Sequence, residues 1–119
     1  MELVLKDSLR LDDGLHAGVI TRIEYRTTIS SYQYADVVIS LSQDGQEVRA
    51  NYPCKELTKE TALWQLLVRF GAVEKIGEVF DVDKVLVGKK CQFLSIRQKS
   101  KKDASKSYAK IIPESLKPL

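Results

Sequence analysis

The chain has 119 residues, of which 44% are apolar and 29% are charged, with 19 basic and 16 acidic side chains. This length suits one domain with its own hydrophobic core, and the composition excludes a disordered chain and a fibrous repeat. No apolar run reaches the about 18 residues of a membrane span, and the N-terminus carries acids where a secretory signal needs basic residues.

Residues able to support catalysis or metal binding are few. The chain has one histidine, His16, and two cysteines, Cys54 and Cys91, and none of them belongs to a CxxC or HxxxH pair of the kind that holds zinc. It has no phosphate-binding glycine motif and no acidic cluster with metal-ligand spacing. We therefore expect a protein that is not an enzyme and needs no metal or cofactor. Free thiols indicate a reducing, cytoplasmic location.

Alternating apolar and polar residues predict three consecutive strands in the first half of the chain. The first covers residues 17–26, and its drier face is expected to hold Ala17, Val19, Thr21, Ile23 and Tyr25. The second covers residues 34–41, with residues 27–33 as the preceding loop. An Asp-Gly turn leads to the third, over residues 47–52, which Pro53 ends. Tyr25 and Tyr52 are in register with the apolar sides, so we expect both in the core.

The period then changes to that of a helix. Thr58 is the expected N-cap of a helix over residues 59–70, with Glu60 in its first turn and Gly71 as its stop. The apolar residues at helical spacing, which predict a buried stripe, are Leu63, Leu66, Leu67 and Phe70. Residues 73–80 predict a short second helix, and residues 81–87 predict a further turn.

Two more strands are predicted towards the end, over residues 89–98 and 108–112. The first places Cys91, Phe93 and Ser95 on one face. Pro113 ends the second, and the tail over residues 113–119 is expected to be a loose end or a single helical turn.

Three meandering strands, a helical segment and a two-stranded hairpin are the element order of an OB-fold, a five-stranded and partly open Greek-key barrel. We therefore predict a mainly β chain with one OB-fold domain over residues 1–119. It would have an N-terminal segment over residues 1–13 and a helical insert between its third and fourth strands. A mixed α+β sandwich is the rival fold.

The positive charge is concentrated in one place. Residues 97–110 hold six basic side chains and one acid, a local charge of +5, whereas the rest of the chain holds 13 basic and 15 acidic side chains, a charge of −2. A lysine-rich segment on a slightly acidic body attracts polyanions, although a lysine-rich loop can also serve solubility alone.

In OB-folds, the loops between strands one and two and between strands four and five flank the ligand-binding face. The first of these loops, RTTISSYQY, contains two tyrosines, and the second, KSKKDASKS, is lysine-rich. Aromatic rings stack on unpaired bases and lysines attract phosphates, both without reading sequence. For Trp64 packing is favoured over a ligand platform. The predicted nucleic-acid-binding residues are Arg22, Arg26, Tyr32, Tyr34, Arg49, Asn51, Trp64, Arg97, Lys99, Lys101, Lys102, Lys106, Tyr108 and Lys110.

The layout of GVITRIEYR, YADVVISL, ALWQLLVRFG, LVGKKCQFLSIRQK and SYAKIIPESLKP resembles the small OB-fold single-stranded-DNA-binding proteins, particularly those of phages. The resemblance covers roughly residues 14 to 118. It implies a protein that coats unwound strands during DNA replication, recombination or repair, without catalysis. Its partner would be single-stranded DNA, with RNA and a homo-oligomer left open and no membrane. The long acidic tail of the common bacterial version is lacking, so recruitment of partners through such a tail is not expected.

A protein-interaction adaptor or accessory subunit, built on the same barrel, is the alternative function. It is favoured by the apolar residues Leu57, Trp64 and Val68 of the helical segment, which are expected to expose more apolar surface than a monomer needs.

Overall fold

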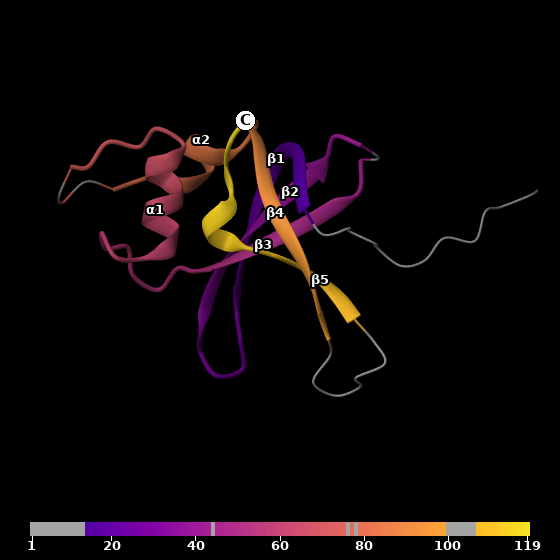
Figure 1. Cartoon of the computed structure of the whole chain (residues 1–119). Coiled ribbons are helices and arrows are strands. Elements are labelled where there is room, and N and C mark those ends of the chain that lie inside the picture. Colours follow the sequence, from indigo (N-terminus) through magenta and orange to yellow (C-terminus); the bar gives the residue numbers. More distant parts are fainter. Residues whose placement is uncertain (1–13, 44, 76, 78, 100–106) are drawn as a thin grey trace, which may run out of the picture.

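The computed structural model describes residues 14–119 apart from residues 44, 76, 78 and 100–106, and the side chains of residues 97–109 lie outside that description. The chain is mainly β, as predicted, and its strands form one antiparallel sheet (Figure 1). The strands are β1 Gly14–Thr27, β2 Gln33–Leu41, β3 Glu47–Pro53, β4 Lys90–Lys99, β5 Ser107–Ile111 and β6 Lys117–Pro118.

The sheet has the strand order β3-β2-β1-β4-β5, and the short β6 pairs with β4. All five predicted strands are therefore present, and the predicted meander of the first three and hairpin of the last two are confirmed, while β1 also pairs with β4. Within the described ranges, β3 and β5 end this path on opposite sides and are not paired with each other. The sheet is therefore open there, and closure into a barrel is not seen.

A bulge in β1 reverses the face that the strand presents to the core. Ile20 pairs with Ile39 of β2, but the next pair joins Arg22 to Val38, so Thr21 is the extra residue. A bulge of one residue shifts the two-residue alternation by one. Ile20 and Ile23 are consequently both buried, whereas Thr21 is exposed. The predicted single drier face of this strand is wrong.

The second and third strands supply much of the core. In β3, Val48, Ala50 and Tyr52 are buried as predicted, and the residues between them are exposed. In β2 the expected apolar face is also buried, but Asp36 and Val38 on the opposite face are buried as well. Because β2 lies between β1 and β3, long side chains from both neighbours cover this second face.

Helix α1, Ala62–Arg69, begins later than predicted. Its N-cap is Thr61, whose hydroxyl accepts a hydrogen bond from the backbone N–H of Trp64 at 3.4 Å. The carbonyl of Thr58 accepts from the backbone and hydroxyl of Thr61, which makes a turn before the helix. Thr58 as the cap and Glu60 in the first turn were therefore wrong. The buried stripe is confirmed for Leu63, Leu66 and Leu67, while Phe70, the C-cap residue, is half-buried.

The region after α1 contains less helix than expected. The described residues between 73 and 80 form none, so the predicted second helix is wrong there. The predicted turn over residues 81–87 is confirmed as α2, Val82–Leu86, with the Asp81 carboxylate accepting from the backbone of Lys84 at 3.3 Å. Phe80 packs edge-on against Trp64, with 4.9 Å between the ring centres.

The C-terminal tail is ordered rather than loose. Pro113–Ser115 form a 3₁₀ turn, η1, and Leu116 is completely buried. The Nε of Arg69 donates to the carbonyl of Leu116 at 2.7 Å, which links the tail to the end of α1. Of the two predicted alternatives, the single helical turn is confirmed and the loose end is wrong, because a single leucine, which no periodic pattern reveals, fills a place in the core.

The core thus lies between the inner face of the sheet and α1, α2 and the tail. The buried apolar residues that form one cluster are Ile20, Ile23, Ala35, Val37, Ile39, Leu41, Val48, Ala50, Tyr52, Leu63, Trp64, Leu66, Leu67, Leu86, Cys91, Phe93, Ile111 and Leu116.

Among the described residues, no helix is long and apolar enough to cross a membrane.

Candidate nucleic-acid interface

The hairpin of β1 and β2 extends beyond the core as an arm. In Figure 1 its turn and the ends of β4 and β5 point towards the same lower edge of the view. The last strand pair of the arm joins Thr27 to Gln33. The turn is closed by the backbone N–H of Thr28, which donates to the carbonyl of Tyr32 at 2.8 Å, and by the N–H of Tyr32, which donates to the Thr28 hydroxyl at 3.2 Å.

The turn of the arm presents apolar and aromatic side chains to solvent. Ile29 is fully exposed at its tip, and Tyr32 is 64% exposed. Neither side chain is needed to fill the core, so a packing role does not account for them. An exposed tyrosine on a hydrogen-bonded turn is a surface on which an unpaired base can stack.

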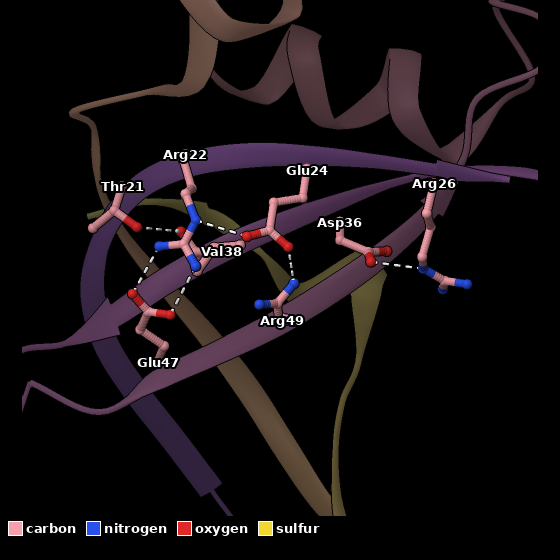
Figure 2. A network of polar contacts seen from close by, with 8 residues as sticks. All are labelled: Thr21, Arg22, Glu24, Arg26, Asp36, Val38, Glu47 and Arg49. Atoms are coloured by element: carbon pink, nitrogen blue, oxygen red, sulfur yellow. Dashed lines mark hydrogen bonds and ion pairs between the residues drawn. The ribbon is translucent and has the colours of Figure 1, made fainter.

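Arg26 is held in place by two neighbours on β2. Its guanidinium carbon lies 4.6 Å from the centre of the Tyr34 ring, and its Nε donates to Oδ2 of Asp36 at 2.7 Å. The Asp36 side chain is only 6% exposed, and its Oδ1 has no hydrogen-bond partner among the described residues. Figure 2 shows the two terminal nitrogens of Arg26 turned away from the sheet. In the described part of the chain they have no hydrogen-bond partner, so two N–H-bearing groups face solvent in a fixed orientation.

Arg22 and Arg49 are placed differently on the same face. Arg22 donates from Nε to Glu24 at 2.8 Å and from its two terminal nitrogens to Glu47 at 2.7 and 3.0 Å. Arg49 pairs with the other oxygen of Glu24, which gives the four-residue cluster of Figure 2. Hydrogen bonds from Arg49 and then Arg22 lower the pKa of Glu24, and those from Arg22 lower the pKa of Glu47. A phosphate that binds Arg22 would have to displace these carboxylates, because all three of its guanidinium nitrogens are bonded to them.

The other predicted site residues are distributed as follows. Asn51 is exposed on β3, opposite Asp36, and Lys110 is exposed on β5. Trp64 is only 8% exposed, so it packs in the core and does not present a platform for a ligand. For the same reason it does not add to the exposed apolar surface that the adaptor hypothesis expects. The residues Lys101, Lys102 and Lys106, and the side chains of Arg97, Lys99 and Tyr108, lie outside the description.

Sequence reasoning missed Tyr25, which was expected in the core but is 56% exposed. It lies on the inner face of β1, where the arm has passed the end of the core. Its hydroxyl donates to Oδ1 of Asp83 at 2.8 Å, linking the arm to α2. Burial of the hydroxyl, and then this bond, raise the pKa of Tyr25. Only the reach of the arm beyond the core, which is a property of the fold, could have identified it.

Comparison with known proteins returns no family model that matches the chain and no curated protein similar to it. In the described residues, no three histidine, cysteine, aspartate or glutamate side chains are grouped so that they could hold a metal ion. The features of this chain that point to a ligand are the arm, its exposed aromatic side chains and the concentration of positive charge over residues 97–110.

Proposed function

We propose that this chain is a sequence-tolerant single-stranded-DNA-binding protein that acts in DNA replication, recombination or repair without catalysing a reaction. The observation that carries the proposal is the arrangement on the arm: Arg26 stacked on Tyr34, two residues from the exposed Tyr32. Basic groups and stacking surfaces side by side are what single-strand binding requires.

We further propose that the sheet belongs to an OB-fold. The strand order β3-β2-β1-β4-β5 is that of an OB barrel before its last pair, between β3 and β5, is added. In support, the hydroxyl of Tyr52 on β3 donates to the carbonyl of Pro113, two residues after β5, at 2.7 Å. This bond ties together the two edges that barrel closure would join.

In the proposed complex, each group on the arm has a different role. The terminal nitrogens of Arg26 bind a phosphate in the bidentate manner that guanidinium favours. Tyr32 stacks on a base, which needs no particular base identity. The lysine-rich segment over residues 97–110, of which Lys110 is described and exposed, attracts the backbone at longer range.

The proposal is tested by titrating the protein into a fluorescent dT oligomer of about 25 nucleotides, with a duplex of equal length as competitor. We expect binding that the duplex competes poorly, because its bases are already stacked on one another. If about four phosphates are neutralised, log K falls with log salt concentration with a slope near −3. Absence of binding at about 50 mM salt would overturn the proposal and leave the adaptor function as the better account.

A further inference from the structure

A hollow of about 410 Å³ lies between the arm and the helical region. We call it the Tyr25 hollow. Its lining residues include Tyr25 and Gln33 of the arm, Cys54 and Leu57 of the segment after β3, Leu63 of α1, Phe80 just before α2 and Val82 in α2. Its volume is within the range of small-molecule sites, and mostly apolar walls with a few polar groups are typical of such sites. No role assigned so far uses this hollow.

The ring of Tyr25 is fixed at the mouth of the hollow. Its backbone is part of the β1–β2 ladder, opposite Ala35, and its hydroxyl is bonded to Asp83 on α2. The ring is therefore anchored at both ends although more than half of the residue is exposed. A ring held in this way loses little conformational entropy when a second ring stacks on it.

Arg26 also contributes to the lining of the hollow, while its guanidinium is bonded to Asp36 on the opposite face of β1. Pairing of β1 with β4 ends at Val19 and Lys90, so β4 does not cover the edge of β1 at Tyr25 and Arg26. A single strand that crosses this edge can place a phosphate on Arg26 and the adjoining base on the inner face. The inner face at this point is the Tyr25 hollow.

We propose that the Tyr25 hollow receives one unpaired nucleobase of the bound strand, stacked on Tyr25 and within reach of the Gln33 amide. A nucleobase suits this site because it is a flat ring with apolar faces and a polar edge, which match the apolar walls and the single amide. The inference rests on the proposed function and adds to it a specific base-binding site.

The test uses the one thiol that lines the hollow. Burial raises the pKa of both thiols, but Cys54 is only half-buried, whereas Cys91 is completely buried and the pKa of its thiol is raised to about 11. Alkylation of Cys54 by iodoacetamide in the native protein, followed by mass spectrometry, therefore reports access to the hollow. With a dT oligomer at about ten times its Kd, we expect the rate to fall about tenfold, because only the unbound fraction reacts. Duplex DNA should have no effect.

An abasic sugar-phosphate strand of the same length is the control that distinguishes protection of Cys54 by a base from protection by the backbone. When enough of it is present to saturate the protein, we expect Cys54 to stay reactive. Protection by the abasic strand equal to that by dT would overturn the proposal, since the backbone alone would then cover the hollow. Unchanged alkylation in the presence of bound dT would also overturn it while leaving the proposed function intact. If dT does not bind at all, both fail.

A pair of variants tests the same point by affinity. Cys54→Phe fills the hollow, and we expect dT binding about tenfold weaker, the loss of roughly one stacked base. Val68→Phe adds the same ring at an exposed position on α1 that does not line the hollow, and this variant should bind as the wild type does. Equal affinity of the two folded variants would overturn the proposal. If Cys54→Phe does not fold, the alkylation experiment on the native protein still decides.

Discussion

Arg26 and Tyr34 are directly opposite each other on β1 and β2, and the guanidinium carbon of Arg26 lies 4.6 Å from the centre of the Tyr34 ring. This cross-strand stack distinguishes the surroundings of Arg26 from those of Arg22 and Arg49 on the same face. Arg22 and Arg49 are bonded to Glu24 and Glu47, whereas the terminal nitrogens of Arg26 point to solvent. All three guanidinium nitrogens of Arg22 are bonded to carboxylates, whereas Arg26 can receive a phosphate on its terminal nitrogens without breaking an ion pair.

The first prediction compares two substitutions that keep the charge. Arg26→Lys should weaken dT binding by up to about tenfold, because lysine cannot make a bidentate contact and stacks less well on tyrosine. Arg22→Lys should change affinity little, because the Arg22 guanidinium is occupied by carboxylates. Fluorescence anisotropy with a dT oligomer measures both. Equal losses would contradict the distinction between the two arginines.

Lysine is chosen over alanine because of Asp36. The Asp36 side chain is 6% exposed, and among the described residues it accepts a hydrogen bond from Arg26. Removing the cation would leave a nearly buried carboxylate without its partner, which is strongly destabilising. Arg26→Ala would therefore confound folding with binding, whereas a lysine retains a positive charge beside Asp36.

The second prediction concerns the exposed ring in the turn. Tyr32→Ala should weaken single-strand binding by about 1–3 kcal/mol, the contribution of one stacked base. Because Tyr32 is 64% exposed, the melting temperature of the Tyr32→Ala variant should stay close to that of the wild type. Tyr32→Phe keeps the ring and is the matched control, with near wild-type affinity expected. A lower melting temperature with unchanged affinity would assign Tyr32 to structure instead.

Periodicity predicted the strands well but could not locate the faces of β1. The segment from Val19 to Tyr25 keeps a regular alternation through Thr21, and nothing in it marks the extra residue of the bulge. Bulges depend on pairing with the partner strand, so they become visible only with the register. The wrong expectations for Ile20 and Tyr25 both concern this strand. Because Tyr25 was expected in the core, the hollow that it lines was not predicted.

The candidate site was also predicted in part. The residue types in the expected loop between the first two strands identified the tyrosines and the basic residue of the arm. They could not distinguish Arg26 from Arg22, because the difference lies in cross-strand neighbours: Glu47 comes within bonding distance of Arg22 only when β1, β2 and β3 are aligned. Sequence separation of 25 residues gives no signal of that contact.

The third prediction tests the ordered tail. Leu116→Ala should lower the free energy of unfolding by about 2–5 kcal/mol, because a completely buried leucine leaves a cavity when truncated. Leu119→Ala, at a position that is 69% exposed, is the matched control and should be nearly neutral. Urea denaturation of both variants measures the difference. A neutral Leu116→Ala would contradict the packing of the tail into the core.

The fourth prediction follows from the lowered pKa of Glu24. Arg49 and Arg22 favour its ionised form in the folded protein, so its pKa is lower there than in the unfolded chain. Its contribution to stability is therefore present above the unfolded-state pKa, about 4.3, and is lost as the pH falls through the folded-state pKa. The wild type should be more stable than Glu24→Gln at neutral pH, and the difference should shrink on acidification.

The measurement for this prediction is urea denaturation of both proteins at a series of pH values. Glu56→Gln, which removes an exposed acid outside the cluster of Arg22, Glu24, Glu47 and Arg49, is the control. Its difference from the wild type should not show the same dependence on pH. A gap between wild type and Glu24→Gln that widens as the pH falls would contradict the ion-pair account.

The most direct test of single-strand binding through the arm is to follow the amide resonances of the ¹⁵N-labelled wild-type protein during titration with a dT oligomer. The account predicts saturable shifts concentrated in residues 25–34, at Cys54 and at Leu63, with little change in residues 65–69 of α1. Saturable shifts confined to α1 and its surroundings, or no shifts at low salt, would contradict it.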